Sequence, residues 1–227
     1  MKFLLIILLS FSSIYAQSEK QQKYVFDVVP KKMTIQEKKT RFYALVTPAI
    51  DKVYKELAKQ YIDIKADLKA KRNHSKIKKL KKIYKVKDDT ELLLALKPHP
   101  KSIVIAQAAM ESAWATSRFF TKAKNIFGIW SFNSKEPRIA SEQKRGTKTI
   151  WLRKFSSIEE SVREYYKLLG RVSVFKKFRE VRNKTDNVFK IIKELDKYSE
   201  IGDKYAQELG SMIRYNKLTK YDILTKL

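Results

Sequence analysis

The stretch from Ile103 to Ala115 constrains the fold most, because ten of its thirteen residues are apolar. A helix that is apolar on almost every side is buried, so this stretch predicts a buried helix. Its polar residues are Gln107, Glu111 and Ser112, and the first two are four apart and share one helix face. A carboxyl group there loses hydration, so its pKa is expected to rise. Glu111 is therefore either a catalytic proton donor or a buried acid paired with a basic residue.

The composition limits the chemistry that the chain can carry. Its 227 residues leave room for one large domain or two small ones, and a hydrophobic fraction of 44% is enough for a packed core. The sequence has no Cys and only two His, His74 and His99, which argues against thiolate nucleophiles and the usual zinc sites. It also has no Gly-rich phosphate loop and no nucleophile elbow. We therefore expect neither a metal nor a cofactor.

The first sixteen residues are typical of a Sec-type signal peptide. Lys2 precedes the apolar run 3–9, and small and polar residues follow as far as Ala16. The run is too short for a stable membrane anchor, although an uncleaved anchor is the alternative. We expect an exported protein of the periplasm or cell envelope. Its net charge of +26 then predicts attraction to anionic envelope surfaces rather than to nucleic acid.

Residues 17–97 are predicted to form a helical extension. Thr34-Ile-Gln-Glu37 is a capping box that starts a helix, and Thr47-Pro48 predicts either a second helix start or a kink in one long helix. Residues 69–87 contain ten Lys or Arg and no acid, around a narrow apolar stripe formed by Ile77, Leu80, Ile83 and Tyr84. This pattern predicts a basic amphipathic helix, whose charged face is either simply solvated or a contact for the envelope.

The region after Ala115 predicts one small β element among helices. Residues 147–155 are rich in β-type residues and follow Gly146, which favours a β-hairpin. Ser157-Ile-Glu-Glu160 is a second capping box, and Gly170 suits the end of its helix. Further helices are expected at about 173–182, 186–196 and 203–216. The predicted fold class is mostly α (α+β), with a small β-lobe inserted after the helix that carries Glu111.

Four ordered blocks of the sequence resemble the glucosaminidase domain of glycoside hydrolase family 73. They are AQAAMESAWATS at 106–117, NIFGI at 125–129, FSSIEESVREY at 155–165 and YSEIGDKYAQEL at 198–209. FYALVTP at 42–48 also resembles the N-terminal helices of the Bax-type branch of this family. The resemblance implies a lysozyme-like fold, with an α-lobe and a β-hairpin lobe flanking a polysaccharide groove. It also implies a catalytic domain at residues 98–220.

The resemblance implies a role for Glu111 as the general acid that protonates a glycosidic oxygen of peptidoglycan, next to N-acetylglucosamine. Most glycosidases use a second carboxylate as well, and the loop residues Glu142 and Glu136 are the candidates. Alternatively, the N-acetyl group of the substrate attacks the anomeric carbon itself. Tyr198 would then position that group, as the family resemblance suggests.

Three aromatic residues are expected to bind the sugar, because sugar rings stack on aromatic faces. They are Phe127, Trp130 and Trp151. Trp114 is instead expected to pack in the core beside the carboxyl group. Two other functions fit the same residues: a lytic transglycosylase of similar fold, and a non-catalytic basic protein that binds the cell wall.

Overall fold

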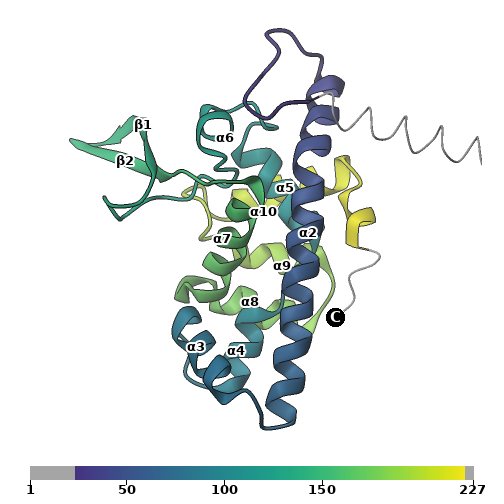
Figure 1. The fold of residues 1–227 in the computed structure, drawn as a ribbon. Coiled ribbons are helices and arrows are strands. Elements are labelled where there is room, and N and C mark those ends of the chain that lie inside the picture. Colours follow the sequence, from purple (N-terminus) through teal and green to yellow (C-terminus); the bar gives the residue numbers. More distant parts are fainter. Residues whose placement is uncertain (1–23, 223–227) are drawn as a thin grey trace, which may run out of the picture.

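The structure is a computed structural model that describes residues 24–222, and of residues 143–145 only the backbone. The signal peptide predicted at residues 1–16 lies outside the described residues. Helices gather along one long helix, α2 (Ile35–Lys69), and a two-stranded hairpin projects near its N-terminal end (Figure 1). The predicted fold class, mostly α with one small inserted β-hairpin, is confirmed. Within the described part of the chain, no helix is both long and apolar enough to cross a membrane.

Helix α2 begins at the predicted capping box and continues through Pro48. The Thr34 hydroxyl accepts a hydrogen bond from the Glu37 backbone N–H, and the Glu37 carboxylate accepts one from the Thr34 backbone N–H. The expectation of a new helix start at Thr47 is wrong, because α2 is one helix across this point. Pro48 has no N–H to donate, so the Ala44 carbonyl loses its usual helical partner. One residue earlier, the Thr47 hydroxyl donates to the Tyr43 carbonyl at 2.7 Å.

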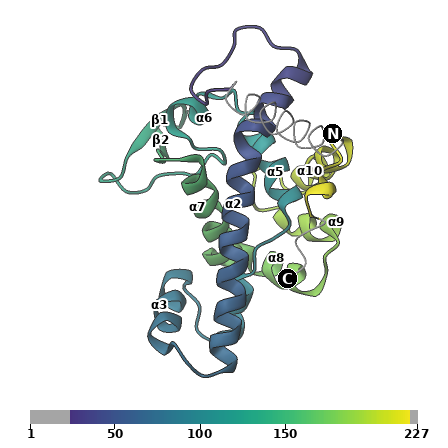
Figure 2. The ribbon, with the colours of Figure 1, turned by 45° about the vertical axis from the view of Figure 1, so that its right-hand side comes forward.

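Two short helices pack beside the C-terminal half of α2 (Figure 2). They are α3 (His74–Tyr84) and α4 (Asp89–Leu96). The predicted basic helix is confirmed, and Ile77, Leu80 and Tyr84 lie in a small second core between these helices and α2. Ile83 was expected in the same stripe but is 37% exposed. The buried side chain at that turn of α3 is its neighbour Tyr84.

Helix α5 (Lys101–Glu111) is the most buried element, and every residue at 102–109 is buried. The main core surrounds it and includes apolar side chains of α2 such as Phe42, Val46 and Ile50. This core therefore spans the boundary predicted between the extension at 17–97 and the catalytic domain at 98–220.

The hairpin region and the helix that follows it lie across a groove from the end of α5. After α6 (Arg118–Ala123), strands β1 (Arg138–Arg145) and β2 (Lys148–Arg153) pair antiparallel around Gly146, as predicted. Helix α7 (Ile158–Arg171) begins at Ser157, whose hydroxyl accepts from the Glu160 N–H. The second capping box is only half formed, because the Glu160 carboxylate bonds Ser156 instead of Ser157.

Gly170 lies inside α7 rather than beyond its end. A Cβ at this position would meet the Ala95 carbonyl and the Tyr84 ring at 2.8 Å. The glycine is therefore needed for the close approach of α7 to α3 and α4, and not for a left-handed cap as the sequence suggested. The cap of α7, Val172, has an extended conformation.

The remaining helices follow α7 in the chain, and all except the last, which was not predicted, lie close to the predicted ranges. They are η1 (Ser173–Phe175), α8 (Lys176–Lys184), α9 (Val188–Ile191), η2 (Ile192–Leu195), α10 (Asp203–Tyr215) and η3 (Leu218–Asp222). Helix α10 packs directly against α5. It thereby places residues near position 205 beside Glu111, about a hundred positions earlier in the chain.

Candidate active site

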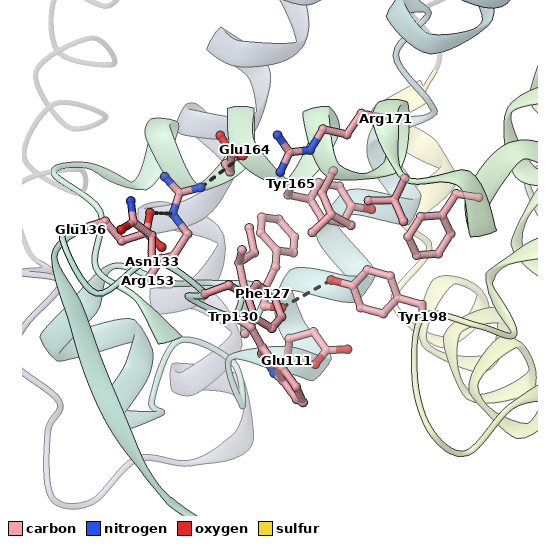
Figure 3. Close-up of a pocket in the computed structure, with 16 residues that line it drawn as sticks. Glu111, Phe127, Trp130, Asn133, Glu136, Arg153, Glu164, Tyr165, Arg171 and Tyr198 are labelled. Carbon is pink, nitrogen blue, oxygen red and sulfur yellow. Dashed lines mark hydrogen bonds and ion pairs between the residues drawn. The ribbon is translucent and has the colours of Figure 1, made fainter. Parts of the chain in front are cut away.

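A groove of about 640 Å³ lies between the end of α5, the loop before the hairpin, and α7 (Figure 3). Glu111 borders it from α5, Phe127 and Trp130 from the loop, and Tyr198 from the segment before α10. The groove has the position that the resemblance implied, between the helical body and the hairpin. The structure therefore brings four of the six predicted site residues together.

The backbone turns sharply directly after Glu111. The predicted helix to Ala115 ends at Glu111, because Ala113, Trp114 and Ala115 have left-handed φ values of 51°, 61° and 62°. This conformation costs about 1–2 kcal/mol for each non-Gly residue. The Ser112 hydroxyl stabilises the turn by donating to the Ala108 carbonyl at 2.5 Å and accepting from the Ala115 N–H at 2.8 Å. Such strain is typical of functional sites whose surroundings hold it in place.

Arg41 of α2 holds this left-handed turn from behind. Its side chain is 1% exposed, and Nη1 donates to the Ala115 carbonyl at 2.7 Å. Nη2 donates to the carbonyls of Val25, Phe26 and Val28, each at 3.0 Å. One guanidinium group thus joins the turn beside Glu111 to the segment that precedes α2. This role of Arg41 could not be predicted from the sequence, because its partners are backbone carbonyls and not acids.

Glu111 is half-buried, and burial raises the pKa of its carboxyl group, as predicted. The Tyr205 hydroxyl donates to Oε1 at 2.9 Å, which acts against this rise because the bond favours the carboxylate. No Lys or Arg among the described residues forms an ion pair with Glu111. The alternative of a buried acid neutralised by a basic residue therefore does not describe this site.

Tyr205 was not among the predicted site residues, whereas Tyr198 was. Tyr198 lines the groove, donates from its hydroxyl to the Phe127 carbonyl at 3.4 Å, and stacks on the Tyr205 ring with centroids 5.4 Å apart. Burial raises the pKa of both phenols well above the usual value. The signal for Tyr205 was present in the sequence, because it lies in the same matched block as Tyr198.

The two carboxylate candidates occupy different places. Glu136 lines the groove and forms an ion pair with Arg153 at 3.2 Å, and Arg153 also contacts Glu164 at 3.1 Å (Figure 3). Glu142 lies on β1 with 85% of its side chain exposed, pairs with Arg118 at 3.2 Å, and is not among the groove residues. Glu164 was not predicted as a site residue. It was noted only as part of the FSSIEESVREY block at 155–165.

The predicted aromatic platform is only partly assembled. Phe127 and Trp130 line the groove, and Phe127 stacks on Tyr165 with centroids 4.0 Å apart. Trp151 lies on β2 beneath the Arg138 guanidinium, at 4.1 Å, and does not line the groove. The groove also has Phe132, which is 88% exposed and was not predicted. An exposed aromatic ring at a groove edge is well suited to stacking on a sugar.

Trp114 is half-buried and packs against the core. Its ring meets the Phe42 ring edge to face at 5.2 Å. Among the residues that the structure describes, no three His, Asp or Glu side chains gather closely enough to hold a metal ion.

Comparisons with known proteins give a family match and several structural similarities. A search of curated proteins finds no match. The chain is similar to the catalytic domain of the autolysin Auto from Listeria monocytogenes, with 21% identity and a TM-score of 0.46, covering 86% of this chain and 100% of that one. It is also similar to a peptidoglycan hydrolase from Sphingomonas sp. A1, with 23% identity and a TM-score of 0.44, covering 58% and 85%. For the glycoside hydrolase domain of FlgJ from Salmonella typhimurium, the identity is 24%, the TM-score 0.42, and the coverage 57% and 83%.

The family model carries more weight than these structures. The Glucosaminidase model, described as mannosyl-glycoprotein endo-beta-N-acetylglucosaminidase, matches residues 88–218. This range is more than half of the chain, and it includes every residue that borders the groove. The match confirms the resemblance found in the four sequence blocks.

Proposed function

The chain belongs to the glucosaminidase family of glycoside hydrolases, and we propose that it is an endo-β-N-acetylglucosaminidase that cleaves the glycan strands of peptidoglycan. One observation carries this proposal: the carboxyl group of Glu111, with its pKa raised by burial, borders a groove lined by aromatic residues. Cleavage of a glycosidic bond needs a carboxylic acid that is still protonated near neutral pH. We assign that role to Glu111.

The second carboxyl role fits Glu136 better than Glu142. Glu136 borders the same groove as Glu111, and Arg153 holds its carboxylate against the groove wall. From there it would activate water or attack the sugar as the oxocarbenium-like charge forms. Glu142 lies on the outer part of the hairpin and pairs there with Arg118 of α6. If the N-acetyl group of the substrate attacks instead, Tyr198 is the groove residue best placed to orient it.

The choice of peptidoglycan is supported by charge as well as by the family. The chain has a net charge of +26, and the stem peptides of peptidoglycan carry carboxylates. Exposed lysines of α3, at 76, 78, 79 and 82, form a basic face outside the groove. We propose that the protein is exported and that this face associates with the anionic envelope. Such binding to isolated sacculi would weaken in high salt, and equal binding in low and high salt would contradict it.

Hydrolysis of purified sacculi tests the proposal. The protein should clear peptidoglycan gels and release fragments whose mass spectra have reducing N-acetylglucosamine ends. Glu111→Gln should abolish clearing, and Glu142→Gln, which changes an exposed carboxylate outside the groove, should keep it. Fragments with 1,6-anhydromuramic ends would identify a lytic transglycosylase. Binding without any clearing, unchanged by Glu111→Gln, would identify a non-catalytic wall-binding protein.

A further inference from the structure

Hydrogen bonds join five polar side chains end to end, from the core to the wall of the groove. This relay, which we define here by its members in order, consists of His99, Tyr165, Gln107, Tyr205 and Glu111. The first four are between 0% and 2% exposed. They come from the loop before α5, from α7, from α5 and from α10, so three helices meet in one chain of polar contacts. Buried polar groups connected in this way hold one another in a single arrangement.

The amide of Gln107 gives the relay a direction. An amide has a donor end and an acceptor end. Its Nε2 donates to the Tyr205 hydroxyl oxygen at 2.9 Å, and its Oε1 accepts from the Tyr165 hydroxyl. Tyr205 already accepts from this amide and has only one hydrogen, which it donates to Glu111 Oε1 at 2.9 Å. Each hydrogen in this half of the relay therefore points toward Glu111.

His99 fixes the direction at the other end. The Tyr165 hydroxyl hydrogen is committed to Gln107, so at 2.9 Å its oxygen can only accept from His99 Nε2–H. His99 Nδ1 is buried without a hydrogen-bond partner. Burial and the charge of Arg182 keep the pKa of this imidazole well below its usual value. His99 is therefore neutral, with its single ring proton on Nε2.

We propose that the relay is a positioning device that keeps the acidic proton of Glu111 on Oε2, free for transfer to the substrate. Oε1 already accepts from Tyr205, so a proton on Oε1 would oppose that donor. A Tyr205 hydroxyl free to turn would accept the proton of Glu111 and compete with the glycosidic oxygen. Because the relay fixes Tyr205 as a donor, this competing bond does not form. The benefit to catalysis rests on the proposed function, whereas the direction of the hydrogen bonds does not.

The charge of Glu111 raises the pKa of three tyrosine hydroxyls. Tyr205 comes from α10, Tyr165 from α7, and Tyr198 from the segment between η2 and α10. The relay reaches Glu111 only through Tyr205. Any effect of Tyr165 that travels along the relay must therefore disappear when Tyr205 cannot donate.

Carboxyl titration by NMR tests this dependence without any substrate. The protein is labelled with ¹³C at Glu carboxyls, and the signal that Glu111→Gln removes is followed with pH. Tyr165→Phe frees Gln107 to reverse its amide, so Tyr205 turns away and the pKa of Glu111 should rise above that of the wild type. Tyr205→Phe should raise it further. Tyr166→Phe is the matched control, because it removes a buried hydroxyl on the same helix that bonds only the His99 carbonyl, at 3.3 Å.

The double variant decides between relay and local packing. With Tyr205→Phe in place, adding Tyr165→Phe should leave the pKa of Glu111 unchanged, because the two residues act in series. The relay would be overturned if Tyr165→Phe shifted the pKa of Glu111 equally in the wild type and in Tyr205→Phe. It would also be overturned if Tyr165→Phe alone caused no shift. Should Tyr165→Phe not fold, Gln107→Met removes the same link and carries the same expectation.

The catalytic role has a separate readout. On peptidoglycan, Tyr165→Phe should lower kcat about tenfold with KM unchanged, whereas Tyr166→Phe should match the wild type. An unchanged kcat with the expected NMR shifts would remove the catalytic benefit and leave the relay as a structural network. A wild-type protein that shows these shifts but does not cleave peptidoglycan would refute the proposed function alone.

Discussion

Replacing Arg41 with Met tests how firmly the turn after Glu111 is held. Methionine keeps most of the buried volume but loses all four hydrogen bonds to backbone carbonyls. The Ala115 carbonyl belongs to a fully buried residue, and leaving such a group unpaired costs about 1–3 kcal/mol. The other three carbonyls belong to half-buried or exposed residues and should regain water, so they add only about 0.5 kcal/mol each. Removal of the unpaired Nε atom of Arg41 offsets part of this loss.

The sum is a destabilisation of about 3 kcal/mol, which corresponds to a fall in Tm of about 6–12 °C for a chain of this size. Differential scanning calorimetry and urea unfolding measure both quantities. Lys55→Met is the control, because it removes the same charge from an exposed site on α2. Arg41→Lys should fall between the two, since an ammonium group cannot span the turn and the N-terminal segment at once.

The same variant should reduce activity more than stability alone explains. Well below its Tm, Arg41→Met should have a lower kcat, because the strained turn relaxes and Glu111 loses its fixed position. If the free energy of unfolding of Arg41→Met is within about 1 kcal/mol of that of the Lys55→Met control, the guanidinium does not hold the turn. If it is destabilised but keeps full kcat, the turn does not position the acid.

Three further outcomes follow from the structure. Burial raises the pKa of Glu111 above its value in the unfolded chain, so Glu111 lowers the stability of the fold once the pH exceeds that unfolded value. Glu111→Gln should therefore raise Tm at pH 8 but not at pH 4. Equal changes in Tm at both pH values would contradict this. Glu136→Gln should lower kcat by about a hundredfold or more while Glu142→Gln leaves it unchanged, and the reverse order would exchange their roles. Gly170→Ala should destabilise by about 1–3 kcal/mol in urea unfolding, because its Cβ meets a backbone carbonyl at 2.8 Å. Gly210→Ala should cost less, because the nearest atom to its Cβ is the end of the flexible Ile192 side chain, at 3.2 Å.

The parts of the fold that the sequence predicted depend on short-range rules. The Thr34 capping box, the buried α5 and the hairpin around Gly146 each follow from a few neighbouring residues. The left-handed turn at 113–115 could not be predicted in this way. Its local cost is offset in part by the bonds of the Ser112 hydroxyl and in part by a bond from Arg41, which lies 74 positions away from Ala115.

The candidate site shows the same division. Glu111 was found because burial of a lone acid can be read from its own helix. The choice between Glu136 and Glu142 depended on which part of the hairpin region faces α7, and the pairing shifts register between Ala140 and Lys144. Trp151 shares a face of β2 with Arg153, which lines the groove, but it lies two residues closer to the tip of the hairpin and does not reach the groove. Patterns in β1 and β2 identify a hairpin but not which of its residues meet the groove.

Glu111 is thus held by two contacts that both come from outside its own segment. Arg41 fixes the backbone after it, and Tyr205 fixes one oxygen of its carboxyl group. The family match begins at residue 88, yet Arg41 and the α2 side chains of the main core lie before that point. Because α2 packs on both α5 and α7, the N-terminal helix stabilises the same turn that places the acid. The extension is therefore better understood as the back wall of the active site than as a separate module attached to it.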